Sequence, residues 1–178
     1  VVAISAGAAL AGEERRRTIA MLYTGRVSRR RVAAHRAVAT VIASFAVGSL
    51  AAAGIALGSW IGGLDMNMAH IAAAGLLLAG LGCVFGGIAF LAGALTGLPR
   101  VAIGAGTGVA VLGWAITAFA EVNDALEGVA RISPYYYATS GLPLETGLSW
   151  YEPLVLFGVA ALAIAGGIAA YRARDLRG

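Results

Sequence analysis

The chain has 178 residues, of which 60% are hydrophobic and only 12% are charged, and its mean hydropathy is +0.83. A soluble domain has about 25% charged residues, so this composition excludes an ordinary soluble domain and predicts an integral membrane protein. The formal net charge of +4 comes with thirteen arginines and no lysine. The absence of lysine excludes the Gly-Lys-Ser/Thr nucleotide loop of an ATPase, and no nucleic acid partner is expected.

Residues 1–12 are apolar but too few to cross a bilayer, because a span needs roughly 20 helical residues. They begin without a methionine and without the basic region that opens a signal peptide. We therefore interpret them as the end of a helix whose first part is missing. This interpretation predicts that the chain is the C-terminal portion of a longer protein.

Residues 13–36 hold eight of the thirteen arginines. A charged residue at the centre of a membrane helix costs about 2.5–3.5 kcal/mol on insertion scales, so this segment must lie outside the hydrocarbon. One explanation for the cluster is a topology signal that also contacts anionic lipid. A second explanation is a docking surface for a partner protein.

The same segment has a helical pattern that a topology signal does not require. Apolar side chains recur with helical spacing between residues 19 and 27. Gly25 can end that helix, and Ser28 can cap a second one that begins at Arg29. We therefore expect two short helices on the membrane surface, with one apolar and one cationic face. Such helices can rest on lipid or dock in a groove of a partner.

Four later stretches are long enough to cross the membrane, at residues 37–62, 71–97, 101–120 and 152–171. They contain no Asp, Glu, Lys, Arg or His, apart from Glu152 at the first position of the last stretch. Pairs of glycines separated by four positions recur in them and indicate close helix crossings. The expected helix-packing residues are Gly58, Gly62, Gly82, Gly86, Gly93, Gly97, Gly104 and Gly108.

The distribution of basic residues predicts the orientation of these spans. If residues 13–36 are cytoplasmic, alternation of the spans places Arg100 and the C-terminal tail in the cytoplasm as well. Twelve of the thirteen arginines then lie inside, and only Arg131 lies outside. The carboxylates expected on the outer side are Asp65, Glu121, Asp124, Glu127, Glu145 and Glu152.

Metal and disulfide chemistry are not expected. Cys83 is the only cysteine, and His35 and His70 are predicted on opposite sides of the membrane. No span carries a Ser/His pair, paired carboxylates or a His/Glu constellation, so an intramembrane enzyme is the least favoured class.

Residues 121–151 form a predicted external interfacial segment. Apolar positions spaced by four and three residues predict a short amphipathic helix at 121–131, which Ser133 and Pro134 would end. The tyrosines and tryptophan that follow suit an interfacial aromatic belt. A second interpretation is that this segment folds back on the outer leaflet and caps an export route.

The arginine-rich segment resembles the cytoplasmic loop in permeases of type-2 ATP-binding-cassette (ABC) exporters. That loop reads Glu, a short gap, Gly-Thr, a leucine-rich turn, Pro-Val-Ser-Arg and a Lys eight residues after the Ser. The residues of this chain on the pattern are Glu13, Glu14, Thr18, Leu22, Val27, Ser28, Arg29 and Arg36. The chain departs from it where Arg17, Arg26 and His35 replace Gly, Pro and Gly.

A second motif, at residues 132–176, is similar to the last external segment and final span of the same family. Its order is Ser-Pro, aromatics, Gly, Pro-Leu, Gly-Leu, Trp, the final span and a closing Arg-x-Arg-Asp-Leu. Both motifs occur in the family's order with three spans between them. Together they extend over most of the chain.

The resemblance implies an all-α transmembrane bundle with four complete spans, the end of a fifth, a cytoplasmic coupling helix and short external helices before the last span. It implies that residues 13–36 dock on a separate ABC ATP-binding subunit, which binds the ATP and Mg. The chain itself would bind no cofactor and no metal and would not be an enzyme. It would pair with a second permease half or copy.

The function implied is multi-pass export across a bacterial plasma membrane by alternating access. The substrate class would be hydrophobic or amphipathic, such as a drug or antibiotic, because the span residues are small and uncharged. Two alternatives stay open: an ion- or proton-coupled secondary carrier, and a membrane scaffold subunit without transport. A carrier needs an ionisable residue at membrane depth, whereas a scaffold predicts that efflux survives its deletion.

Overall fold

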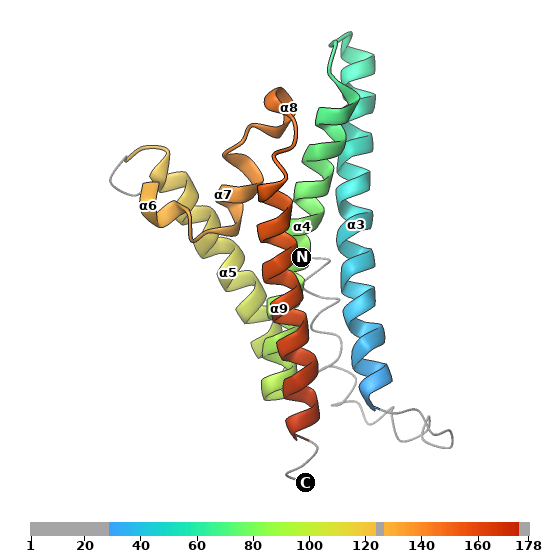
Figure 1. Ribbon diagram of the computed structural model, residues 1–178, viewed down its shortest axis with the longest axis vertical. Helices are drawn as coiled ribbons and strands as arrows, with labels where there is room; N and C mark the ends of the chain where they lie inside the picture. The colour runs from blue at the N-terminus through green and yellow to red at the C-terminus, as the bar shows by residue number, and fades with distance from the viewer. Residues whose placement is uncertain (1–28, 124–126, 175–178) are drawn as a thin grey trace.

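The computed structural model describes residues 29–123 and 127–174, and every regular element in these ranges is a helix. Within residues 29–123 and 127–174, four long helices and three short ones follow one another (Figure 1). Their bounds are α3 Arg29–Gly62, α4 Met68–Thr96, α5 Pro99–Ala120, α6 Glu127–Ala130, α7 Pro134–Thr139, α8 Pro143–Thr146 and α9 Tyr151–Arg174.

Within the described residues, the four long helices are the parts that can cross a membrane. Their apolar lengths are Ala33–Gly62, Met68–Thr96, Pro99–Ala120 and Tyr151–Tyr171. The prediction of four long apolar helices, in this order, is therefore confirmed for the described residues. Residues 1–12, which we expected to end a further span, lie outside them.

Helix α3 differs from the sequence-based expectation. We expected a separate surface helix to begin at Arg29 and to end before the span, whereas α3 runs without interruption from Arg29 to Gly62. That prediction was wrong because no Gly or Pro breaks the chain between Arg29 and the middle of the span. The hydroxyl of Thr40 donates to the carbonyl of Arg36, so this polar side chain is satisfied inside the helix.

Helix α4 is the centre of the bundle, and α3, α9 and α5 pack around it. Leu77, Leu81, Val84 and Phe85 of α4 form the main core with Leu156 of α9. Figure 1 shows α5 leaning away from the other three long helices toward α6. The outward faces of α3, α5 and α9 are apolar and exposed, which fits contact with lipid or with other membrane helices.

Small residues allow α4 to approach its neighbours closely. A Cβ on Gly48 of α3 would overlap the carbonyl oxygen of Gly75 of α4. A Cβ on Gly80 would lie 3.1 Å from Leu156 Cβ of α9. These contacts bring backbones together, and close packing is the main attraction between helices in a bilayer.

Two adjacent glycines of α9 provide a test of this packing. A Cβ on Gly167 would lie 2.6 Å from a ring carbon of the fully buried Phe90, whereas a Cβ on Gly166 would lie 3.5 Å from Leu91 Cδ1. We expect Gly167→Ala to destabilise the protein by about 1–3 kcal/mol. Gly166→Ala should be neutral or slightly stabilising, because alanine favours a helix by up to about 1 kcal/mol over glycine.

Thermal unfolding of the full-length protein in detergent measures both variants. The midpoint of Gly167→Ala should fall, and that of Gly166→Ala should stay at or above the parent value. Equal midpoints for the two variants would contradict the described contact between α9 and Phe90.

Candidate functional site

One end of the bundle carries the arginines of the described residues, Arg131 excepted. The first turns of α3, the start of α5 and the last turns of α9 lie at this end (Figure 1). The arginines in these turns are Arg29, Arg30, Arg31, Arg36, Arg100, Arg172 and Arg174. We call this the arginine end.

The opposite end carries the carboxylates, and we call it the outer end because the distribution of arginines predicts that it faces away from the cytoplasm. The described acidic residues there, in turns, short helices and the start of α9, are Asp65, Glu121, Glu127, Glu145 and Glu152. His70 near the start of α4 lies at this end, and His35 near the start of α3 lies at the arginine end. In the part of the chain that the structure describes, no group of three His, Cys, Asp or Glu side chains can hold a metal ion.

Of the eight residues that match the family's loop pattern, the structure describes two. Arg29 is the first residue of α3, and Arg36 lies two turns later and is half-buried. The others, Glu13, Glu14, Thr18, Leu22, Val27 and Ser28, lie outside the described residues. The described part of the predicted docking segment, residues 29–36, thus belongs to α3 and continues into the span without a break.

The segment at the outer end folds differently from the expectation. Residues 121 and 122 are in a turn, and the only helical residues described between 121 and 131 belong to α6. Ser133 and Pro134, which we expected to end a helix, instead begin α7. The Ser133 hydroxyl accepts from the Tyr135 amide at 3.2 Å, and proline at the first helical position needs no hydrogen-bond acceptor. The single helix predicted at 121–131 was therefore wrong.

Ser133 also connects α7 to α5 through a hydrogen bond. Its hydroxyl, on a side chain that is 2% exposed, donates to the Gly113 carbonyl at 2.8 Å. The Thr117 hydroxyl lies 3.0 Å from the same carbonyl and 3.0 Å from Ser133 Oγ. Because Gly113 has no side chain, Ser133 can approach: a Cβ there would be 3.1 Å from its hydroxyl. The buried polar groups of this junction satisfy one another.

Helix α7 packs against the bundle with its tyrosine side chains half-buried. The ring of Tyr135 lies 5.5 Å from that of Phe85 in α4, and the ring of Tyr137 lies 5.5 Å from that of Tyr151 in α9. Burial raises the pKa of the Tyr135 phenol, so this side chain stays neutral. Trp150, in contrast, is 80% exposed, as expected for an interfacial aromatic.

Glu152 is a buried carboxylic acid in the first turn of α9. The residue is 5% exposed, and its Oε2 has no hydrogen-bond partner. The carboxylate lies against the backbone of Gly141, where a Cβ would overlap Oε1. The Thr146 hydroxyl in turn donates a hydrogen bond to the Gly141 carbonyl. The hydrophobic sequence around residue 152 gave no indication that this charge would be buried.

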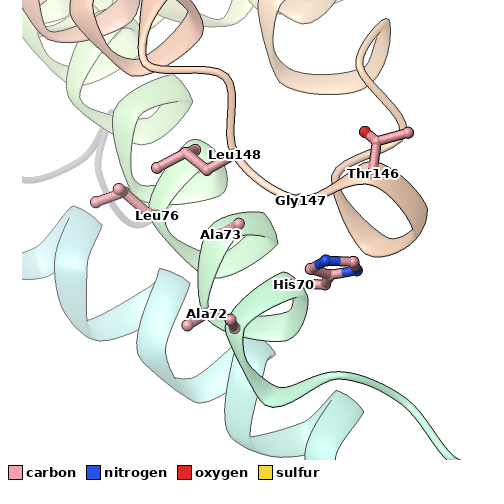
Figure 2. Close-up of a pocket in the computed structure, with 8 residues that line it drawn as sticks. His70, Ala72, Ala73, Leu76, Thr146, Gly147 and Leu148 are labelled. Carbon is pink, nitrogen blue, oxygen red and sulfur yellow. The ribbon is translucent and has the colours of Figure 1, made fainter.

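A hollow of about 520 Å³ lies between α4 and the segment that follows α8. Figure 2 shows the His70 ring between the two walls, beside Gly147. The His70 Nδ1 lies 3.2 Å from the carbonyl oxygen of Leu144. Gly147 has φ +86°, and a Cβ there would lie 3.2 Å from His70 Nε2, so glycine lets the chain pass the imidazole. No pattern in the sequence predicted that residues 70 and 147 would lie side by side.

Comparison with known families decides what this helical bundle is. The family described as "Multidrug efflux system permease Rv1217c, C-terminal domain" matches residues 1–172. The chain belongs to this family. No curated protein and no solved structure matches it.

Family membership confirms the expectation that the chain is a C-terminal portion of a permease subunit. The permease is a multi-pass membrane protein of multidrug efflux, since it combines this family match with four helices able to cross a membrane. It is a transporter component rather than an enzyme.

The predicted packing glycines of the permease divide into two groups. On α4, Gly82 approaches Ser44 of α3, Gly86 and Gly93 are buried, and Gly97 ends the helix with φ 68°. The remaining four glycines have few or no neighbours. A Cβ would lie in open space at Gly58, Gly104 and Gly108, and at Gly62 it would contact only Leu64. Contact of this second group with another helix stays a prediction.

Proposed function

We propose that this permease is the membrane component of an ATP-driven type-2 ABC exporter, with a separate ATP-binding subunit docking at the arginine end. The observation that carries the proposal is the continuity of α3. A partner that moves the arginines at residues 29–31 moves the membrane span itself, because no break separates them. Residues 13–28, which the resemblance assigns to the same docking surface, immediately precede this helix.

The charge content of the spans supports a partner as the energy source. A proton- or sodium-driven carrier needs an ionisable residue at membrane depth. Within the four spans, the acidic, basic and histidine side chains lie near helix ends, and the central turns carry none. The energy for transport would then enter through the arginine end, and the substrate would be a hydrophobic or amphipathic compound moved out of the cytoplasm of a bacterium.

One observation favours the alternative of an ion-coupled secondary carrier. Glu152 is buried in the first turn of α9, and its Oε2 has no hydrogen-bond partner. A carboxylate in this state is a typical proton or cation site in carriers. The two functions make opposite predictions for removal of its charge: efflux continues in an ATP-driven exporter and is lost in an ion-coupled carrier.

The experiment that tests the proposal is an affinity purification of the full-length protein from native membranes. We expect a P-loop ATPase to co-purify with the parent and to be lost when Arg29, Arg30 and Arg31 are all changed to Glu. The matched control changes the same three residues to Lys, which keeps the positive charge that sets topology. This control should retain at least part of the ATPase, because lysine lacks only the planar guanidinium contacts.

Membrane insertion of each variant must be compared by introducing a cysteine into the α3–α4 connection and labelling it from the outside. Absence of the ATPase from the parent, or its full retention by a correctly inserted Glu variant, would contradict docking at the arginine end.

A further inference from the structure

Helices α3 and α4 are longer than a bilayer is thick. The apolar part of α3 has 30 residues and that of α4 has 29, whereas that of α9 has 21. At about 1.5 Å per residue these lengths are about 45, 43 and 31 Å. The hydrocarbon core of a bilayer is about 30 Å thick. Helix α9 therefore matches the bilayer, and α3 and α4 exceed it by about 13–15 Å.

Contacts between the helices show at which end this excess length lies. A Cβ on Gly80 of α4 would lie 3.1 Å from Leu156 of α9, and both helices run from the outer end to the arginine end. Five residues further out on each, Tyr151 at the start of α9 is thus level with Gly75. A Cβ on Gly75 would in turn lie 2.8 Å from Ala52 Cβ of α3. The start of α9 is therefore level with residue 75 of α4 and residue 52 of α3.

Beyond this level α3 and α4 continue toward the outer end. From residue 52 to its end at residue 62, α3 rises by about 15 Å, and from residue 75 back to its start at residue 68, α4 rises by about 10 Å. Figure 1 shows both helices extending past the start of α9. We call residues 53–74 the α3–α4 extension.

Tilt of the bundle does not remove this difference in height. Membrane helices tilt by about 20° on average and by up to about 40°. Helices α3 and α9 both pack along α4. A tilt that lowers the height of α3 therefore lowers that of α9 as well, and the α3–α4 extension still lies further out.

The surface of the α3–α4 extension is apolar. Five of its large hydrophobic side chains are 57–80% exposed: Leu57, Trp60, Ile61, Leu64 and Met68. The exposed apolar surface of α3 continues into it from the span, where Leu50 is exposed just below the level of residue 52. No charged residue occurs between Arg36 and Asp65. Sites for protein partners are typically apolar patches with a polar rim, whereas this surface is continuous with that of a membrane span.

The turn between α3 and α4 pairs its backbone groups within the protein. The Leu64 amide donates to the Ser59 carbonyl at 2.9 Å, and the Ser59 hydroxyl donates to the Leu64 carbonyl at 2.7 Å. Gly63, with φ +64°, supplies the left-handed residue that closes such a helix end. The Asn67 side chain accepts from the Ala69 amide at 2.9 Å at the start of α4. This internal pairing suits lipid surroundings, because lipid tails form no hydrogen bonds.

We propose that the outer leaflet of the bilayer covers the α3–α4 extension, so that lipid extends about 10–15 Å further out along α3 and α4 than along α9. The outer surface of the bilayer then has a step at this protein, where the leaflet thickens on one side and thins on the other. Asp65 and Asn67 lie at the upper level of the step, and Trp150 and Tyr151 lie at the lower one. This inference depends on the membrane location of the bundle and not on ATP as the energy source.

The test measures how close single residues lie to the lipid chains. The full-length protein, with its native cysteines replaced by alanine, receives one cysteine at an exposed position and is labelled with a nitrobenzoxadiazole fluorophore. The positions are Leu57→Cys and Ile61→Cys in the extension, with Trp150→Cys before α9 as the matched control. Each protein is reconstituted in phosphatidylcholine vesicles that contain phosphatidylcholine with a nitroxide on its acyl chain, which quenches nearby fluorophores. Iodide in the buffer quenches fluorophores that are exposed to water.

We expect nitroxide quenching at residue 57 to be at least as strong as at residue 150, and quenching at residue 61 to be similar to that at residue 150. In a flat bilayer, residues 57 and 61 would lie about 8 and 14 Å above the start of α9, and their nitroxide quenching would be roughly five-fold weaker than at residue 150. Weak nitroxide quenching with strong iodide quenching would overturn the proposal and leave the extension in water, open to a protein partner. Weak quenching by both agents would also overturn it, because a second copy would then cover the extension.

Two double variants test whether the apolar surface holds the leaflet at the higher level. Trp60→Ser with Ile61→Ser, in the Leu57→Cys protein, should lower nitroxide quenching at residue 57 several-fold. The matched control, Leu154→Ser with Leu162→Ser, also replaces two exposed apolar side chains by serine, but on α9. It should leave the quenching at residue 57 unchanged. An equal effect of the two double variants would contradict the proposal.

Discussion

Replacement of Gly48 by alanine is expected to lower the stability of the bundle, although alanine is the better helix former. The added Cβ would overlap the carbonyl oxygen of Gly75 and would lie 2.9 Å from Ala79 Cβ. A carbonyl in the middle of a helix cannot rotate away, so α3 and α4 must separate along their crossing. Overpacking of this kind costs about 1–3 kcal/mol and sometimes more.

Gly54→Ala is the matched control for this effect. Gly54 lies on the same helix, is exposed, and would have no atom within 4 Å of an added Cβ. Here only the helix propensity acts, which favours alanine by up to about 1 kcal/mol. The two substitutions are chemically identical and should shift the stability in opposite directions.

The measurement is the unfolding midpoint of each purified full-length variant in the same detergent. A change of 1 kcal/mol corresponds to roughly 2–4 °C for a chain of this size. We expect a fall of several degrees for Gly48→Ala and a small rise for Gly54→Ala. A rise for both would mean that α3 and α4 do not cross at Gly48.

Glu152→Gln is expected to stabilise the protein and to leave efflux intact. Burial of an unpaired carboxylate costs several kcal/mol, whereas the favourable position of an acid in the first turn of a helix contributes only about 0.3–1 kcal/mol. The desolvation cost is therefore the larger effect. Glutamine keeps the shape of the side chain and removes the charge, at the smaller cost of an unpaired amide, about 1–3 kcal/mol.

Glu145→Gln is the control for this prediction, because Glu145 of α8 is exposed and its removal should leave the midpoint unchanged. Efflux of a fluorescent drug from cells that express each variant gives the second readout. If Glu152→Gln unfolds at a higher temperature yet abolishes efflux, the carboxylate is used in transport, and the ion-coupled carrier replaces the ATP-driven exporter. A lower midpoint would show that the carboxylate has a stabilising partner.

Hydropathy predicted the four membrane helices because it sums over about 20 residues, so a single misplaced residue has little effect on the result. The ends of elements depend on fewer residues and were harder to predict. The pair Ser133–Pro134 is compatible both with the end of one helix and with the beginning of the next. The hydrogen bond from the Tyr135 amide to the Ser133 hydroxyl identifies it as the beginning of α7.

The sites at the outer end could not be predicted, because they depend on contacts between distant segments. His70 contacts α8, more than seventy residues later in the chain, at the carbonyl of Leu144. The burial of Glu152 requires Gly141 to lie across it. The arginine cluster was recognisable in the sequence as a charge pattern. That its arginines from Arg29 onward belong to α3 was not predicted, because the charged residues were interpreted as lying outside the membrane helix.

The sparse packing of α5 has a mechanical consequence. Its buried residues are Ala102, Gly106 and Gly113, all small. A surface without protruding side chains does not interlock with its neighbour, so α5 resists displacement along α4 less than α9 does, and small sliding of packed helices is a recognised mode of domain motion. Because Ser133 connects α7 to α5, both would shift together, and a short displacement of α5 would separate the ring of Tyr135 in α7 from that of Phe85 in α4.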